Sequence, residues 1–449
     1  MTLSCFKPYD VRGKVPDHLN PDIAYRIGRA FAEELGAREV AVGRDVRPTS
    51  PALRDGVVAG LNAGGAAAYD IGLCGTEMVY FATFARGLDG GIMVTASHNP
   101  RDYNGLKLVG EDARPLSADT GLTAIRERAE ALEAPAAPEP WPHPLNITPE
   151  YLAHVLGYVE RDVLAPLRIV ADSGNGGAGP VIDGLEPHLP FEFVKVRHQP
   201  DGNFPQGIPN PLLPENRAVT AEAVTDYGAD LGIAWDGDFD RCFLFDGEGH
   251  FVEGYYLIGL LARTFLAKRP GAPIVHDPRL TWNTIETVRA GGGEPVQSKT
   301  GHAFMKEAMR RVDAVYGGEM SGHHFFRDFA YCDSGIIPWL VVTELMSRTG
   351  KSLGELVAEQ QAAYPCSGEI NFEVADPHGV MEAVVTEFAT DEAIIDRTDG
   401  VSVELAEWRF NLRPSNTEPL LRLNVETRGD SRLLADRVAA LKKAIEANG

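Results

Sequence analysis

The sequence is poor in cysteine, in long apolar runs and in positive charge. Its five cysteines are widely scattered and none belongs to a C-x-x-C pair, so neither a structural zinc site nor a disulfide framework is indicated. Such a pattern favours a reducing compartment, and we expect a cytoplasmic protein. The first ten residues lack the basic and apolar regions of a signal peptide. The most apolar stretches, 255–266 and 336–346, are too short and too interrupted to span a membrane.

The shortage of positive charge excludes whole classes of partner. Lys and Arg number 42 against 64 Asp and Glu, which gives a formal net charge of -22 at pH 7. Duplex nucleic acid and anionic membranes both require a basic surface, so we expect neither as a partner. The same charge argues, at first sight, against a phosphorylated substrate. Apart from charge, the composition is that of a soluble globular protein, and 449 residues suggest two to four domains.

One pattern recurs three times along the chain. A short apolar run rich in β-branched residues opens into a polar loop that contains aspartate, and a helical stretch follows; the runs are residues 39–42, 168–171 and 273–276. Later in each stretch a second run opens into a denser polar loop, at 91–94, 231–234 and 314–316. The alternation predicts βαβ units with mixed or parallel sheets. Ligands of such sheets bind beyond the carboxyl ends of the strands, where these loops lie.

The chain also shows where its segments end. Residues 134–149 are dense in Pro and Ala, and this composition predicts a linker without regular structure. Further breaks are expected after the hairpin-like stretch 243–250 and near 364–368. The tail then alternates strands and helices and ends in an amphipathic stretch, 431–447. These breaks predict four domains: 1–145, 146–250, 251–365 and 366–449.

An acidic loop follows the run at 231–234. Asp236, Asp238 and Asp240 stand at i, i+2 and i+4, and oxygen ligands on a tight loop suit a hard cation such as Mg²⁺. An EF-hand is excluded because its sixth position would be Arg241 instead of glycine and its twelfth Gly247 instead of glutamate. A solvated acidic turn is the alternative, but three acids with a Gly and an Arg after a buried strand favour a metal site.

A serine loop follows the run at 91–94. In Thr95-Ala96-Ser97-His98-Asn99-Pro100, Ser97 is a candidate nucleophile that His98 could orient. There is no G-x-S-x-G motif, so an α/β-hydrolase is not supported. Taken alone, the loop is more typical of a Ser or Asn helix cap before Pro100, and only the other loops favour the nucleophile.

Two more loops carry groups suited to a phosphorylated sugar. The loop 318–324, GEMSGHH, offers a carboxylate, a hydroxyl and imidazoles that could bind a polyol, although a polar turn explains it equally well. The loop 413–419, RPSNTEP, offers a guanidinium, hydroxyls, an amide and backbone N–H groups, a set that binds phosphate. A capped turn with one solvated arginine is its alternative. His302, in another polar loop, is a candidate general acid or base, or a surface histidine.

Four of these motifs occur in one chain in an order that is characteristic of a known enzyme family. TASHNP, DGDFDR, GEMSGH and RPSNTEP, at about this spacing, resemble the α-D-phosphohexomutase family, and the resemblance extends from residue 9 over nearly the whole chain. It implies an α/β fold of four domains around a central cleft: three related mixed α/β domains and a smaller α+β C-terminal domain. The GEMSGH motif is similar to the one found in bacterial phosphomannomutases, and many of those enzymes also act on glucose phosphates. Phosphoglucosamine mutases usually carry another residue at the position of Met320.

The resemblance implies a phosphoryl shuttle between mannose 6-phosphate and mannose 1-phosphate, and between the corresponding glucose phosphates. Ser97 would carry a phosphate, pass it to the sugar and recover the other phosphate from a hexose 1,6-bisphosphate that turns around in the cleft. One Mg²⁺ ion is implied as cofactor, with the bisphosphate as activator. The implied metal ligands are a phosphoserine oxygen of Ser97 and the carboxylates of Asp236, Asp238 and Asp240.

The resemblance also implies roles for the other loop residues. The catalytic candidates besides Ser97 are His98, Lys107, His302 and Arg12, and which of the last three moves the hydroxyl proton stays open. The implied substrate-binding residues are Tyr9, Arg241, His302, Glu319, Ser321, His323, Arg413, Ser415, Asn416 and Thr417. We expect a monomer whose partner is a phosphosugar.

Two other functions fit the same loops. A metal-dependent phosphatase would use the same serine and cation but release phosphate steadily. A non-catalytic sensor of sugar phosphates would bind without turnover, but it gives no reason for a serine loop beside three carboxylates. The net charge does not contradict a phosphosugar, because Arg12, Lys107, Arg241, Arg413 and a divalent cation would make one pocket locally positive.

Overall fold

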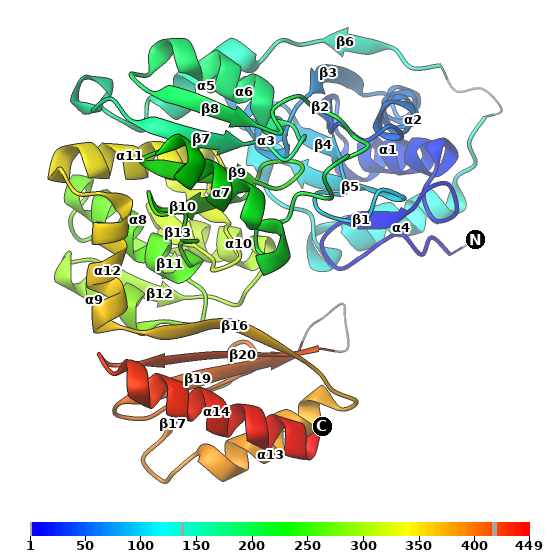
Figure 1. Cartoon of the computed structure of the whole chain (residues 1–449). Helices are drawn as coiled ribbons and strands as arrows, with labels where there is room; N and C mark the ends of the chain where they lie inside the picture. Colours follow the sequence, from blue (N-terminus) through cyan, green and yellow to red (C-terminus); the bar gives the residue numbers. More distant parts are fainter. Residues whose placement is uncertain (1, 136–138, 415–419) are drawn as a thin grey trace. The chain divides into compact units, whose positions relative to one another are not determined.

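The computed structural model describes residues 2–135, 139–414 and 420–449 (Figure 1). The chain divides into two compact units, one made of Met1–Phe251 with Gly322–Gly350 and the other of Val252–Ser321 with Lys351–Gly449. Within the described ranges, every helix is too short or too polar to cross a lipid bilayer.

A six-stranded mixed sheet organises the N-terminal part of the first unit. Its strand order is β1-β5-β4-β2-β3-β6, with β2 parallel to β3 and β4, and β5 antiparallel to β4. The strands are β1 Val11–Lys14, β2 Glu39–Arg44, β3 Ala67–Leu73, β4 Gly90–Val94, β5 Tyr103–Gly110 and β6 Pro142–Pro144. The central strand β4 is buried over its whole length, so both faces of the sheet are covered, as the apolar run at 91–94 predicts.

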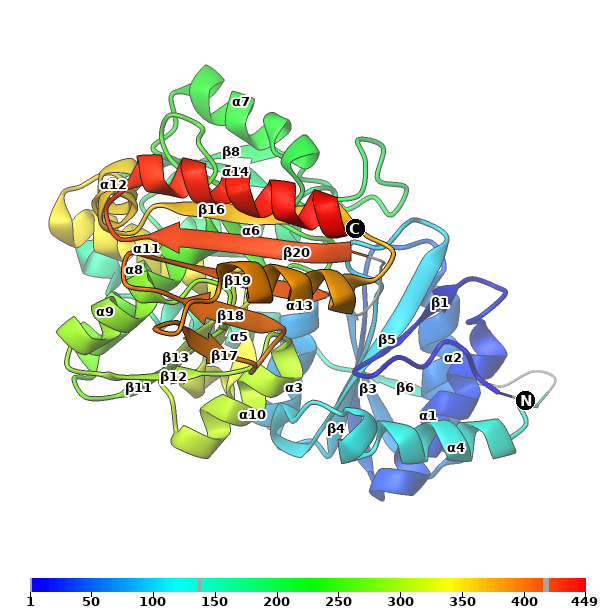
Figure 2. The same cartoon turned by 90° about the horizontal axis from the view of Figure 1, so that it is seen from below.

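Helices cover this sheet on both faces (Figure 2). Residues of α1, α2 and α4 form one apolar core with β2, β4 and β5, while α3 packs on the other face of β2 and β4. The helix α1 begins at an Asn20 cap that accepts the Ile23 N–H (3.0 Å) and ends at Gly36 with φ +61°. The bounds are α1 Pro21–Leu35, α2 Ser50–Ala63, α3 Thr76–Arg86 and α4 Leu122–Ala131.

The prediction of an unstructured linker over 134–149 is wrong for its second half. Residues 142–144 form the edge strand β6, which pairs in parallel with β3, and the helix α5 already begins at Thr148. Proline is tolerated on an edge strand because its missing N–H faces no neighbour. The pairing uses backbone groups only, so the side-chain pattern carries no sign of it.

A second mixed sheet lies in the same unit, with strand order β10-β9-β7-β8. Its strands are β7 Arg168–Asp172, β8 Glu192–Val196, β9 Leu231–Trp235 and β10 Cys242–Phe245. The antiparallel pair of β9 and β10 holds the acidic loop between its two strands. The unit also contains α5 Thr148–Leu156, α6 Ala178–Leu185, α7 Ala218–Tyr227, β14 His324–Phe326, β15 Cys332–Asp333 and α11 Ile337–Thr349.

The second unit begins with parallel strands between helices. β11 pairs in parallel with β12 and with β13. The elements are α8 Gly254–Lys268, β11 Pro273–His276, α9 Trp282–Ala290, β12 Glu294–Gln297, α10 His302–Val312, β13 Tyr316–Gly318 and α12 Leu353–Ala363. β13 begins two residues later than the predicted run at 314–316.

The C-terminal part of this unit is an antiparallel sheet of order β16-β20-β19-β18-β17. Helices α13 and α14 lie together on one face of it (Figures 1 and 2). The elements are β16 Cys366–Glu373, α13 Pro377–Phe388, β17 Ile394–Asp396, β18 Val401–Glu404, β19 Trp408–Pro414, β20 Leu420–Thr427 and α14 Ser431–Asn448. Mixed α/β segments followed by a smaller α+β segment confirm the predicted fold class.

The two compact units do not follow the predicted domain limits. Residues 322–350 group with the first unit, although the predicted third domain is 251–365. We keep the four domains 1–145, 146–250, 251–365 and 366–449 as a proposal.

A buried glutamate joins three segments of the first unit. Glu77, at the start of α3, is fully buried and accepts hydrogen bonds from the Tyr151 hydroxyl, the Ser334 hydroxyl (2.8 Å) and the Gly335 N–H (2.5 Å). Burial raises the pKa of Glu77 to about 8 in spite of these donors. The folded chain therefore keeps a proton that the unfolded chain releases near its ordinary pKa of 4.5, so this carboxyl's contribution to stability falls as pH rises from about 4.5 to about 8.

Replacing Tyr151 by phenylalanine should destabilise the first unit by about 1–3 kcal/mol, because a buried carboxyl loses a donor. The loss should be larger above the Glu77 pKa than below it, since the ionised carboxylate depends more on its donors. Urea unfolding at two pH values, about 6 and about 9, measures both effects. Tyr227→Phe, at a 57% exposed position, is the control and should change stability by less than about 0.5 kcal/mol. Equal effects of the two substitutions would contradict the role of Tyr151.

Candidate active site

Ser97 lies in the tight turn between β4 and β5. It is 4% exposed, its backbone adopts the left-handed region with φ +46°, and its N–H is held by the Thr95 hydroxyl (2.9 Å). A left-handed non-glycine residue costs about 1–3 kcal/mol, which the surrounding contacts must offset. The Ser97 hydroxyl lies 2.6 Å from Asp236 Oδ2 and 3.0 Å from His98 Nδ1. The serine loop and the acidic loop, nearly 140 residues apart in sequence, thus meet at this hydroxyl.

The acidic loop meets the serine loop closely because of its glycine. A Cβ on Gly237 would stand 2.8 Å from the Ser97 carbonyl oxygen, nearer than such atoms approach. All three aspartates of the loop are buried, and one oxygen of each lies within 4.8 Å of the others. In each carboxylate Oδ1 has no hydrogen-bond partner among the described residues. Orphaned, buried and oxygen-only, this donor set fits a hard divalent cation.

Basic groups hold the other oxygens of the cluster. Lys107 Nζ lies 2.7 Å from Asp238 Oδ2 and also contacts Asp240. Arg241 donates to Asp236 Oδ2 through Nε (2.9 Å) and Nη2 (2.7 Å). The structure thus places these five side chains, three acidic and two basic, in one cluster beside Ser97.

The charges in this cluster shift one another's pKa values. Burial alone would raise the pKa of all three aspartates, but Arg241 lowers that of Asp236 and Lys107 lowers that of Asp238. Burial and the neighbouring Asp238 charge raise the pKa of Asp240 to about 6. Burial opposes the charge of Lys107, yet the two facing carboxylates raise its pKa. Lys107 is therefore an ammonium group in this arrangement and a donor rather than a base.

His98 and Arg12 border the serine loop. Burial and the Arg241 charge lower the pKa of His98 to about 4, so the ring is neutral near pH 7 and its Nδ1 accepts from Arg241. Arg12, on β1, donates to the Asn99 side chain, to the Ala96 carbonyl (3.3 Å) and to Asp10 (2.6 Å). The structure places Tyr9 in the bend just before β1.

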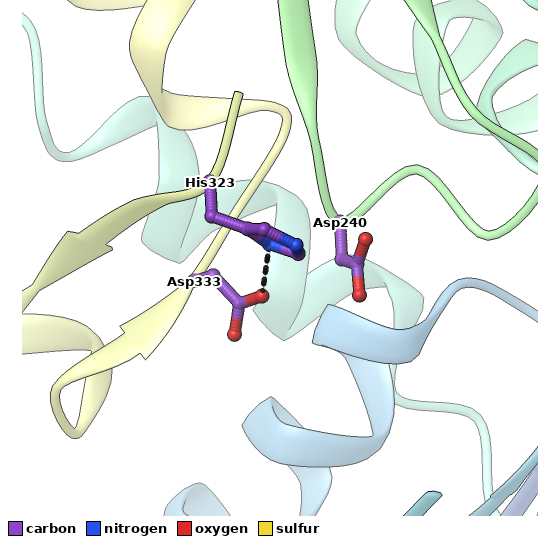
Figure 3. Close-up of side chains that lie close together, drawn as sticks. All are labelled: Asp240, His323 and Asp333. Atoms are coloured by element: carbon purple, nitrogen blue, oxygen red, sulfur yellow. Dashed lines mark hydrogen bonds and ion pairs between the residues drawn. The ribbon is translucent and has the colours of Figure 1, made fainter. Parts of the chain in front are cut away.

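His323 also belongs to the first unit and points towards Asp240 (Figure 3). Its Nδ1 lies 2.8 Å from Asp333 Oδ2, and Asp240, His323 and Asp333 each offer an atom within 4.8 Å of the others. Asp333 could not be predicted as a site residue from the sequence, because a single aspartate before Ser-Gly matches no motif. Thr76 could not be predicted either. Its hydroxyl donates to Asp238 Oδ2 (2.5 Å), but a threonine at the start of a helix suggests only a helix cap.

The loop 318–321 lies in the second unit beside the turn that carries His302. Glu319 is buried, and its Oε1 accepts the Gly301 N–H while its Oε2 lies 3.4 Å from the Ser321 hydroxyl. His302 is the first residue of α10 and directly follows Gly301. The Met320 N–H donates to Asp277 Oδ2 (2.8 Å), which fixes the loop. Glu319 thus lies beside Ser321 and beside the start of the helix that His302 opens.

Arg413 stands near the end of β19, in the same unit. Its guanidinium lies 3.9 Å from both Glu369 and Asp399, and Glu369 also faces Arg279 at 3.4 Å. Burial and the Arg279 charge lower the pKa of Arg413. Both contacts of Arg413 are longer than a hydrogen bond, so its guanidinium can still donate to an anion. Ser415, Asn416 and Thr417, the other predicted phosphate-binding residues, lie outside the described residues.

The fold and the site define a class of protein: an α/β chain in which a serine after a buried strand meets three buried carboxylates that fit a cation. Models of four successive phosphoglucomutase/phosphomannomutase domains match this chain. The alpha/beta/alpha domains I, II and III match residues 4–136, 149–249 and 253–364, and the C-terminal domain matches 369–444.

Three relatives illustrate the similarity. Phosphohexose mutases of Xanthomonas campestris are 59% identical over 447 residues, covering 99% of this chain and 100% of the relative. A phosphomannomutase of Escherichia coli K12 is 56% identical, covering 98% of both chains. A crystal structure of a phosphoglucomutase/phosphomannomutase family protein from Burkholderia thailandensis has a TM-score of 0.86 at 32% identity, covering 100% of this chain and 98% of the other. The chain belongs to the phosphoglucomutase/phosphomannomutase family, the phosphohexomutases that its motifs resemble.

Proposed function

We propose that this chain is a phosphomannomutase, an isomerase that interconverts mannose 6-phosphate and mannose 1-phosphate and also the corresponding glucose phosphates. The observation that carries the proposal is the Ser97 hydroxyl 2.6 Å from Asp236, at the edge of three buried carboxylates that each keep an unpartnered oxygen. A nucleophilic serine at a cation site is what transfer of a phosphoryl group requires. The relatives named phosphomannomutase, 53–57% identical over nearly the whole chain, support the same activity.

The cation of this proposal is one Mg²⁺ ion held by Asp236, Asp238, Asp240 and a phosphoserine oxygen of Ser97. When bound, it offsets the negative charge of the phosphoryl group in transfer. Arg241 is fixed by two hydrogen bonds to Asp236, so its positive charge stays beside Ser97 without reorganisation. Neutral His98 accepts from Arg241 and contacts the Ser97 hydroxyl, which orients both groups.

Each phosphoryl transfer also moves a proton of the sugar hydroxyl. Lys107, held as an ammonium by two aspartates, can donate or polarise but cannot accept. Arg12 is a permanent cation that polarises without exchanging a proton. His302 can do either, and we propose it as the base among these three candidates, since its ordinary pKa lies near neutrality.

Sugar recognition is proposed for the loops 318–324 and 413–419. Glu319 and Ser321 would hold ring hydroxyls, and Arg413 would bind the phosphate that is not reacting. The remaining substrate contacts of the proposal are Tyr9, His323, Ser415, Asn416 and Thr417. A hexose 1,6-bisphosphate is the proposed intermediate and activator, and the enzyme is proposed to act as a monomer in the cytoplasm.

Two measurements on the full chain test this function. Mass spectrometry should find one phosphate on Ser97 after incubation with hexose 1,6-bisphosphate. Coupled assays should then detect isomerisation of mannose 1-phosphate and glucose 1-phosphate with little release of inorganic phosphate. Steady phosphate release without isomerisation would identify a phosphatase instead, and binding without turnover would identify a sensor.

A further inference from the structure

A buried arginine lies directly behind the serine loop. Arg47 follows β2 and precedes α2, and its side chain is 1% exposed. It touches neither the three aspartates nor the Ser97 hydroxyl through any of its hydrogen bonds. Burying a guanidinium at this depth is costly unless its donors are used.

The terminal nitrogens of Arg47 all donate to one segment of the chain, residues 97–103. Nη2 donates to the carbonyls of Ser97 (2.9 Å) and Asn99 (2.6 Å), and Nη1 donates to those of Pro100 (2.7 Å) and Tyr103 (3.0 Å). Four carbonyls, three in the turn after β4 and one on the first residue of β5, therefore converge on one planar group. A lysine could not reproduce this arrangement, since its three donors radiate from a single nitrogen.

The guanidinium is itself fixed from behind. Arg47 Nε lies 3.4 Å from Asp45 Oδ2, and Asp45 Oδ1 accepts the Arg47 N–H (2.9 Å) and the Ser50 hydroxyl (2.5 Å). Asn104 Nδ2 donates in turn to the Ser50 hydroxyl (2.9 Å). Asp45 is 2% exposed, so the counter-charge is as buried as the arginine. These contacts fix the Arg47 side chain, and Arg47 in turn fixes the loop to which it donates.

We propose that Arg47 is a positioning residue for Ser97. It holds the four carbonyls so that the turn stays in the left-handed conformation that directs the serine hydroxyl at the acidic loop, where Ser97 has φ +46°. The inference rests on the proposed function, since it concerns the placement of a serine that carries phosphate. Arg47 acts through the backbone of the loop and contributes nothing to sugar or phosphate binding.

This role makes a prediction that a merely structural arginine does not. Arg47→Lys should lower kcat by about 100-fold, the cost of a displacement of about 1 Å at a reacting group, while KM for mannose 1-phosphate stays within about twofold. Phosphate transfer from glucose 1,6-bisphosphate to Ser97, followed by quenching and mass spectrometry, should slow by the same factor. Each activity is divided by the folded fraction measured by circular dichroism, so that a smaller amount of folded enzyme is not mistaken for a lower kcat.

The matched control is Arg197→Lys. Arg197 is also buried in the first unit and paired with an aspartate, Asp172, but it does not contact the serine loop. If both variants keep wild-type kcat, or if both lose it equally, the positioning role is overturned. If Arg47→Lys does not fold, Ser50→Ala is the milder test, because it removes one hydrogen bond that holds Asp45 beside Arg47. A lower kcat with unchanged KM supports the role, and wild-type kinetics overturns it. Wild-type protein without phosphate on Ser97 would instead refute the proposed function itself.

Discussion

Ser97→Ala should lower isomerisation of mannose 1-phosphate by at least about 10⁴-fold, because the variant has no oxygen that can carry the phosphoryl group. The fold should persist. The substitution removes a hydroxyl that hydrogen-bonds to the Asp236 carboxylate and lies near His98, and the loss of a bond to a charged group costs about 1.5–3 kcal/mol. A coupled assay, run with and without added glucose 1,6-bisphosphate, measures the turnover, and thermal unfolding measures the stability.

Ser173 provides the matched control for this experiment. It follows β7 as Ser97 follows β4, it is fully buried, and its hydroxyl has no hydrogen-bond partner among the described residues. Ser173→Ala should therefore keep nearly full turnover. Robust isomerisation by Ser97→Ala under both assay conditions would refute the phosphoserine mechanism.

Removing divalent cations should also stop nearly all turnover. With excess chelator we expect a loss of at least about 10³-fold, and added Mg²⁺ should restore the activity, since the charge of the transferring phosphoryl group is otherwise not offset. Binding to the folded chain should also raise its melting temperature. A concentration 100 times the dissociation constant corresponds to about 2.7 kcal/mol of added stability.

The acidic loop offers a direct check on where the cation binds. Asp238→Asn removes one of the three buried carboxylates and should remove the Mg²⁺-dependent rise in melting temperature. Asp246→Asn changes an aspartate in the turn after β10, outside the cluster, and should keep that rise. Full activity in excess chelator, or a melting response that survives in Asp238→Asn, would disprove the metal site.

Much of the fold was predictable because its strands are short, apolar and buried. The runs at 39–42, 168–171 and 273–276 coincide with β2, β7 and β11, and the runs at 91–94 and 231–234 with β4 and β9. Burial on both faces leaves a continuous apolar run, a pattern legible without any partner strand. The strand β6 was missed for the opposite reason: at the sheet edge it pairs through its backbone, and its side chains are exposed.

The candidate site divides in the same way. Asp236, Asp238 and Asp240 form a motif because one ion needs several oxygens close together, and on a tight loop this spacing is written in the sequence. Thr76, Asp333 and Arg47 form no motif. Thr76 and Arg47 act on residues far away in the chain, Thr76 on Asp238 and Arg47 on the carbonyls of the serine loop, and a single side chain carries no sign of its distant partner.

By itself the sequence determined the kinds of chemistry present and the loops that carry them, because strand, turn and ligand spacing are local properties of the chain. It also explains how a chain of net charge -22 can be proposed to take a phosphosugar, since a few of its basic residues, such as Arg241 and Arg413, stand in or beside those loops. Only the tertiary structure decided which groups meet: that Ser97 faces Asp236, that Lys107 spans Asp238 and Asp240, and that Arg47 lies behind the turn. These contacts depend on the packing of separate sheets, whose free energy is spread over many buried side chains and is legible in no single segment.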